Sequence, residues 1–308
     1  MSYLTLSAGT ALSRSIDDYP EGIVIPVDKP YRWTSADVIR KVKWMAVKHF
    51  GKRNLKVGHA GTLDPLATGV LLVCIGKATK LAESFQKAPK QYLAGVTFGA
   101  TTASYDLEKE VDNFCSLEGV SEEALRAVLP SFIGEQDQVA PLFSAKSVDG
   151  VRVYELARKR YKAGLPVEEP GLLQASRITV YDLQLVQFRE GADGRVYHPG
   201  GMPPSALLEG GAQPQVGRDA GAAGTGSDGI PFRQPNSRIH VAEIPDGLPA
   251  AEILVDCSKG TYIRALARDL GEALGSGAFL HSLRRTRNAG FCVEDALSID
   301  EISEILSA

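Results

Sequence analysis

Short apolar runs divided by polar turns give this chain the pattern of a buried sheet. The clearest run is residues 70–75 (VLLVCI), in which every position is apolar, as is typical of a buried strand. Residues 90–99 alternate instead, with their large apolar side chains on one face, which predicts a strand with one face in the core. Further strands are predicted over residues 22–30, 178–186 and 252–257.

Helices are predicted where the apolar spacing changes to three and four residues. Thr34 followed by Asp37 is a capping-box pattern, and the apolar face that follows ends at Phe50 and Gly51. Two more helices are predicted, over residues 121–129 and residues 263–274, the second stopped by Gly275. Strands and helices are interspersed without strict β-α-β alternation, which favours an α+β fold.

Two segments depart from this pattern. Residues 1–21 are polar and aperiodic, so we expect a flexible lead-in to a single domain over residues 22–308. Eleven glycines fall within residues 191–230, where apolar side chains are few. Such a segment cannot bury enough apolar surface to offset its ordering entropy, so we expect a disordered surface insertion over about 191–235.

Composition narrows the possible partners. The net charge of −3 provides no global basic field, so any nucleic-acid binding must come from local clusters: Lys77 with Lys80, residues 158–162 and residues 284–287. Four cysteines without C-x-x-C spacing and five histidines without an H-x-x-x-H pair predict no metal site and no disulfide framework. No secretory signal or apolar run of membrane-spanning length is visible, so we expect a cytoplasmic protein without membrane contact.

Candidate chemistry centres on Asp64, within residues 56–69 (KVGHAGTLDPLATG). Glycines allow sharp turns and close approach to a ligand, and Pro65 restricts the backbone of Asp64. Asp64 therefore lies on a shaped loop that leads into a core strand, a favourable place for catalysis. The alternative from these residues alone is an Asp-Pro turn in which Asp64 binds its own backbone.

This stretch resembles the G-H-x-G-T-L-D-P-x-A-x-G signature of the TruB family of tRNA pseudouridine synthases. Other segments resemble the family's motifs as well: K-x-Y at residues 90–92, the segment 138–158, C-S-x-G-T-Y-I-R at 257–264 and L-R-R-T at 283–286. Arg32 stands where glycine is usual, so a left-handed backbone there would be strained and the loop is expected to differ. Ala140 and Phe143 replace a proline and a tyrosine.

The resemblance implies a pseudouridine synthase fold, a mixed and largely antiparallel sheet flanked by helices with a central catalytic cleft. It implies Asp64 as the catalytic aspartate, with Arg264 fixing its carboxylate and Tyr92 lying against the target uracil. By periodicity alone Tyr92 is a core aromatic. The resemblance also implies six substrate-binding residues: His59, Tyr262, Leu283, Lys29, Lys259 and Arg158. Lys29 and Arg32 are equally well explained as solvated surface charges.

Residues 138–164 are expected to form a thumb-like element that closes on RNA, although a charge run such as 158–162 is more often a solvated face. Many family members end in a small RNA-binding domain, but too few residues follow Phe291 here, so no separate one is expected.

The implied activity is conversion of uridine to pseudouridine at position 55, in the T loop of tRNA, on a flipped-out base and without cofactor or metal. The expected partner is the tRNA T stem-loop, bound by a monomer. Two alternatives remain open: a catalytically idle protein that binds or folds RNA on the same scaffold, and a synthase that acts on another structured RNA.

Overall fold

The computed structural model describes residues 3–144, 146–148, 151–165, 167, 173–191 and 239–308. The predicted insertion over 191–235 therefore lies, apart from its first residue, outside the described residues. Ten strands form one sheet, in which only β1 with β2 and β4 with β13 pair in parallel. In sheet order its strands are β1 (Leu4–Thr5), β2 (Ile23–Lys29), β4 (Ala67–Ile75), β13 (Ala278–Asn288), β5 (Lys90–Phe98), β12 (Ala250–Cys257), β11 (Ser176–Arg189) and β8 (Gly134–Gln138), while β3 (Val57–His59) pairs with β4 and β14 (Phe291–Cys292) with β13.

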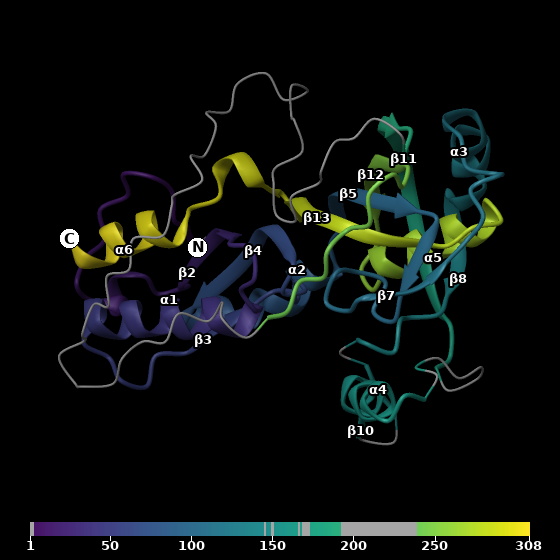
Figure 1. Ribbon diagram of the computed structural model, residues 1–308. Helices are drawn as coiled ribbons and strands as arrows, with labels where there is room; N and C mark the ends of the chain where they lie inside the picture. The colour runs from purple at the N-terminus through teal and green to yellow at the C-terminus, as the bar shows by residue number, and fades with distance from the viewer. Residues whose placement is uncertain (1–2, 145, 149–150, 166, 168–172, 192–238) are drawn as a thin grey trace.

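Helices cover this sheet at both ends. Figure 1 shows α1 and α6 beside β2, β3 and β4, and α5 beside β13. The helices are α1 (Ser35–Phe50), α2 (Ala82–Lys87), α3 (Glu122–Val128), α4 (Val153–Lys162), α5 (Ile263–Ala273) and α6 (Ile299–Ser307), with 3-10 turns η1 (Ile16–Asp18), η2 (Gly76–Leu81), η3 (Leu129–Phe132) and η5 (Val293–Asp295). This arrangement confirms the expected class, a largely antiparallel sheet flanked by helices.

Local sequence signals account for most of these elements. Thr34 caps α1, with reciprocal hydrogen bonds to Asp37, and Gly51 ends the helix in the left-handed conformation, as predicted. The alternating residues of β5 place Tyr92, Ala94 and further apolar side chains in the core. Strand β13 is central because it joins the two halves of the sheet, pairing with β4 on one side and β5 on the other.

The segment around α4 stands apart from the main sheet (Figure 1). Two short hairpin strands, β9 (Ser147–Val148) and β10 (Val151–Arg152), precede the helix, and a second hairpin, of β6 (Ala100–Thr102) and β7 (Val111–Phe114), lies elsewhere. The α4 segment has a small apolar cluster of its own, which includes Leu142, Phe143, Val153 and Ala157 and packs against Tyr262. The cluster connects the thumb-like segment to the start of α5.

Two of the segments discussed above carry structure of their own. Within the expected lead-in, residues 3–21 are described: β1 extends the sheet, Leu6 is fully buried, and a ring nitrogen of His49 lies 3.1 Å from the Ser13 carbonyl oxygen. Arg32 adopts the left-handed conformation, with φ of 63°. There the Arg32 guanidinium donates a hydrogen bond of 2.8 Å to the Ile239 carbonyl, which helps to offset the strain.

Among the described residues, no helix is long and apolar enough to cross a membrane. No group of three or more His, Cys, Asp or Glu side chains in the same ranges is arranged to hold a metal ion.

Gly69 permits the close approach of β4 to β13. Its φ is 95°, and a Cβ there would lie 2.2 Å from the Arg285 carbonyl oxygen, whereas Gly51, at φ 63°, has open space around it. We expect Gly51→Ala to lower the free energy of unfolding by roughly 1–2 kcal/mol, the cost of a left-handed residue with a Cβ. Gly69→Ala should cost clearly more because backbone atoms must move apart. Denaturant unfolding of both variants tests this, and equal losses would contradict it.

Candidate active site

The loop that carries Asp64 is fixed at both ends by the chain around it. Ser35, the first residue of α1, accepts a hydrogen bond from the Leu63 amide (2.9 Å) and donates one to the Leu63 carbonyl (3.1 Å). The Asp64 carbonyl accepts from the Ala67 amide at the start of β4. The side chain of Asp64 itself remains 38% exposed, so it is held in place and still reachable from outside.

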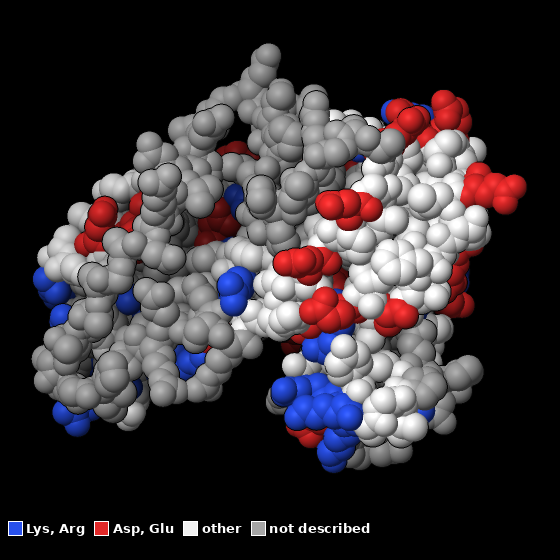
Figure 2. Space-filling model, in the orientation of Figure 1, with Lys and Arg blue, Asp and Glu red and all other residues white. Residues whose placement is uncertain are grey.

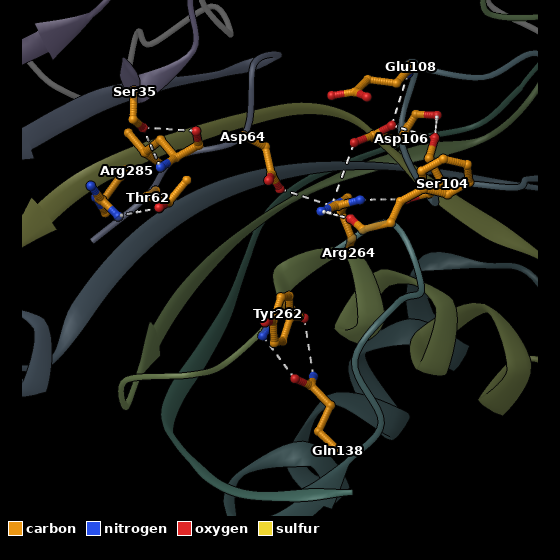
Figure 3. Close-up of polar contacts among 12 residues, drawn as sticks. Ser35, Thr62, Asp64, Ser104, Asp106, Glu108, Gln138, Tyr262, Arg264 and Arg285 are labelled. Carbon is orange, nitrogen blue, oxygen red and sulfur yellow. Dashed lines mark hydrogen bonds and ion pairs between the residues drawn. The ribbon is translucent and has the colours of Figure 1, made fainter. Parts of the chain in front are cut away.

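Arg264 connects this loop to three other parts of the chain. It lies in the first turn of α5 and is 6% exposed. Its Nε is 2.9 Å from the Asp64 carboxylate and 3.6 Å from that of Asp106. Its two terminal nitrogens donate to the carbonyl oxygens of Ser104 (3.1 Å) and Phe143 (2.8 Å). Figure 3 shows Asp64 and Asp106 on either side of this one guanidinium.

Burial and charge oppose each other in this group. Burial lowers the pKa of Arg264, but Asp64, Asp106 and Glu108 outweigh it and raise the pKa overall. Burial raises the pKa of Asp106, while Arg264 and the Ser104 hydroxyl act in the other direction. Burial and the two aspartates raise the pKa of Glu108 to about 7. The pKa of Asp106 is raised overall, because burial outweighs the effect of Arg264.

A narrow pocket opens beside Asp64. Its lining includes Arg264 and Asp106 on one side and Ala67, His281 and Leu283 on the other. Its free volume is about 20 Å³, room for a water molecule rather than a nucleobase.

His281 is a fully internal part of that wall. It lies at the irregularity where β13 shifts register against β5, and its Nδ1 is 2.9 Å from the Thr97 hydroxyl. Burial lowers its pKa to about 3, so the ring is neutral at physiological pH. Its contribution is to shape the pocket beside Leu283 without adding charge.

The two aromatic residues predicted for the site, Tyr92 and Tyr262, do not line this pocket. Tyr92 is in the main core and 9% exposed, opposite Arg285 on β13, and it is not among the residues that line the pocket. Burial raises the pKa of its phenol. Tyr262 caps α5, and Gln138 holds it through two hydrogen bonds, to its amide (2.9 Å) and its carbonyl (3.2 Å). Gln138 thereby joins the thumb-like segment to α5.

Lys29 lies in neither of the two predicted environments, the solvated surface or the RNA-binding surface. It is fully buried, and its ammonium donates to the carbonyl oxygens of Pro30 (3.0 Å), Trp33 (2.5 Å) and Pro65 (3.2 Å). Lys29 is thus neither a solvated charge nor a phosphate contact. It holds the residue that follows Asp64.

The cluster at residues 284–287 is also turned largely inward. Arg285 is 1% exposed and donates to the carbonyl oxygens of Val70, Thr62 and Gly61, on both sides of the catalytic loop. Arg284 pairs with Asp28, and Arg287 pairs with Asp256. The expectation that this cluster binds phosphates is wrong for Arg285, because its donors are used within the fold.

Three other predicted residues are distributed around the site. His59 lies in β3 beside the catalytic loop, half-buried, with its pKa lowered by burial and by Arg285. Lys259 is exposed in the turn before α5. Arg158 is exposed on α4, with its guanidinium 5.6 Å from the Tyr154 ring. The structure brings together Asp64, Arg264 and Leu283 but not Arg158.

Fold and site together comprise a largely antiparallel, helix-flanked sheet that presents an accessible carboxylate ion-paired with a buried arginine. A solved structure of a Cbf5–Nop10–Gar1 complex contains a chain of similar fold, with a TM-score of 0.54 at 22% identity. That match covers 98% of this chain and 62% of the other.

Sequence comparisons identify the family. Residues 48–196 match TruB family pseudouridylate synthases (N-terminal domain), and residues 264–308 match the tRNA pseudouridylate synthase B C-terminal domain. A tRNA pseudouridine synthase B from Phocaeicola vulgatus is 38% identical over 289 residues, 94% of this chain and 95% of that protein. One from Bacteroides thetaiotaomicron is 38% identical over 93% and 94% of the two chains. The chain belongs to the TruB family of pseudouridine synthases.

The lowered pKa of Lys29, which holds the loop that carries Asp64, can be tested by the pH dependence of stability. Burial lowers its pKa from 10.5 to about 7. Between these pH values the unfolded chain holds a proton that the folded protein lacks, so this group makes the free energy of unfolding rise with pH. Lys29→Met lacks this contribution. The free energy of unfolding of wild type minus that of the variant, measured by urea unfolding, should therefore rise from about pH 7 toward pH 10.5. A difference that stays constant over this range would contradict the lowered pKa of Lys29.

Proposed function

We propose that this chain converts uridine to pseudouridine at position 55, in the T loop of tRNA, with Asp64 as the catalytic carboxylate. The observation that carries the proposal is the accessible Asp64 carboxylate held 2.9 Å from the buried Arg264 guanidinium. The similar proteins named tRNA pseudouridine synthase B support tRNA as the substrate class. We propose the T stem-loop as the partner, bound by a single copy of the chain.

The reaction sets the demands on the site. The bond from ribose C1′ to uracil N1 breaks, and a bond from C1′ to C5 forms. The C5 proton leaves and N1 gains a proton, so the overall change is an isomerisation that needs no oxidant or reductant. Asp64 acts beside C1′, as nucleophile or as stabiliser of developing positive charge. Arg264 pairs with that carboxylate and fixes its direction.

The target base must leave the RNA stack to reach Asp64, at a cost of a few kcal/mol. Because the pocket holds only about 20 Å³, we propose that the flipped base displaces the wall near Leu283. Tyr92 would then lie against the uracil and Tyr262 beside the sugar. Burial raises the pKa of Tyr92, so its phenol stays protonated, which argues against the phenolate form as the acceptor of the C5 proton.

RNA contacts outside the pocket are proposed for the exposed basic groups. Figure 2 shows Lys and Arg side chains gathered on the separate segment that Figure 1 labels α4. Arg158 and Lys159 are exposed there. His59 and Lys259 lie nearer the catalytic loop and α5, where they would contact the RNA around the flipped base. These groups position the RNA and do not touch the bond that breaks.

Asp64→Asn tests the catalytic assignment. The change is nearly isosteric but removes the negative charge, so we expect unchanged thermal unfolding and tRNA affinity with no detectable turnover. Pseudouridine is mapped in a tRNA transcript incubated with wild type or variant. Product formation by the variant near the wild-type rate would remove Asp64 from the mechanism. No product from wild type would favour a protein that only binds or folds RNA.

The basic face of α4 gives a separate prediction. Replacing Arg158, Lys159 and Arg160 together with Gln should weaken tRNA binding and flatten the dependence of log K on log salt by about two, because each phosphate contact contributes about 0.7–0.9. Single-turnover chemistry at saturating RNA should change much less. The matched control replaces Lys87, Arg126 and Arg177, which are exposed and ion-paired with nearby glutamates. Equal slopes for both triple variants and wild type would show that α4 is merely solvated.

A further inference from the structure

A second basic surface lies on α1, away from α4. Between Asp37 and Asp64 the chain has no carboxylate and seven cationic side chains, in a protein whose net charge is −3. The seven are Arg40, Lys41, Lys43, Lys48, Lys52, Arg53 and Lys56. We call this surface the α1 ridge. Figure 1 shows α1 and α4 well separated, so the ridge is not part of the α4 segment.

Four of the seven cations lie on α1 and three follow its last residue, Phe50, while the other face of the helix is fixed in the core. Val38, Val42 and Met45 are buried, while Lys43 and Lys48 are exposed. Two of the seven cations are neutralised locally, Arg40 by Asp37 and Lys52 by Asp17. Within the described part of the chain, no carboxylate pairs with Lys43, Lys48, Arg53 or Lys56. The ridge therefore keeps an excess of positive charge.

An exposed tryptophan lies in the middle of the ridge. Trp44 is 52% exposed, and the ammonium groups of Lys41 and Lys48 lie 5.5 and 5.6 Å from its ring centroid. Such cation–π contacts hold flexible lysines in place at modest energy. Trp44 thus orders two charges on the surface and contributes no packing to the core comparable with that of Val42.

The N-terminal end of α1 lies next to the proposed active site. Ser35 at the start of α1 binds both backbone groups of Leu63, next to Asp64. From there the helix runs outward for roughly 22 Å, at about 1.5 Å per residue. An RNA whose uridine lies at Asp64 has further phosphates at such distances, and nucleic-acid duplexes carry about one charge per 1.7 Å of axis.

We propose that the α1 ridge is a second RNA-binding surface, which contacts the phosphate backbone of tRNA outside the T stem-loop. The proposal rests on the proposed function, because it takes tRNA as the molecule held at Asp64. An anionic membrane is a less suitable partner. A helix that binds in a membrane interface inserts its apolar face, and the apolar face of α1 is already buried in the core.

The test combines Lys43→Gln, Lys48→Gln and Arg53→Gln in the full chain. Affinity is measured across a salt series for two RNAs, a complete tRNA transcript and an isolated T stem-loop. We expect the complete tRNA to bind at least tenfold more weakly and its salt slope to fall by about two to three. The isolated T stem-loop should bind the variant and the wild type equally, because it does not extend along the ridge.

The α4 triple variant is the matched control, since it removes the same charge from a different surface and should weaken binding of both RNAs. Unchanged binding of complete tRNA to the ridge variant would overturn the proposal, as would equal weakening for both RNAs. Loss of wild-type binding to phosphatidylserine vesicles in the ridge variant, with tRNA binding intact, would assign the ridge to membranes instead. Failure of the proposed function is distinguished because wild type would then form no pseudouridine in either RNA.

Discussion

The buried guanidinium of Arg264 is the group on which the site depends. Four segments distant in sequence meet at it: the loop before β4 through Asp64, the loop after β6 through Ser104 and Asp106, the thumb-like segment through the Phe143 carbonyl, and α5 itself. A buried charge is tolerated only when it is paired and its donors are hydrogen-bonded. Removing one partner of a buried ion pair costs about 3–5 kcal/mol. The need to satisfy this cation therefore fixes the relative positions of all four segments.

The same requirement explains why other cations are internal. Lys29 and Arg285 direct their donors to backbone carbonyls on both sides of Asp64 and thereby hold the loop that carries it. Glycines give that loop its shape, but they also leave it free to move. Cationic side chains that bind its carbonyl oxygens remove this freedom. The loop that carries the partly exposed Asp64 carboxylate is thus bound to its surroundings at several backbone groups.

Local sequence signals predicted much of the fold, and the motif predicted the central pair. The capping box at Thr34, the alternation through Tyr92 and the apolar run of β4 each depend on neighbours in sequence, and each is confirmed. The predicted proximity of Asp64 and Arg264 is confirmed as well, but it came from the family resemblance and not from periodicity. The pocket residue His281 and the bridging residue Gln138 carried no local signal for their positions.

The failures share one physical cause. Lys29, Arg285 and the first residues of the chain are polar or aperiodic, which favours surface positions when only neighbours are considered. Distant partners contribute in each case: Pro65 accepts from Lys29, Val70 accepts from Arg285, and β2 pairs with Leu4 and Thr5, next to the buried Leu6. Arg32 adopts a glycine-like conformation because a distant carbonyl, that of Ile239, binds its side chain. Long-range contacts of this kind leave no periodic trace.

The distinction between buried and exposed cations bears on how a protein with a net charge of −3 binds RNA. A cation whose donors are bound to internal carbonyls cannot release counterions from a phosphate, so Lys29 and Arg285 contribute nothing to the salt dependence of binding. Only outward cations count, and among the described residues several of them lie on α4 and on the α1 ridge. If both surfaces bind RNA as proposed, the two separated surfaces orient it, and the Asp64 loop, held by the first residue of α1, lies beside one of them.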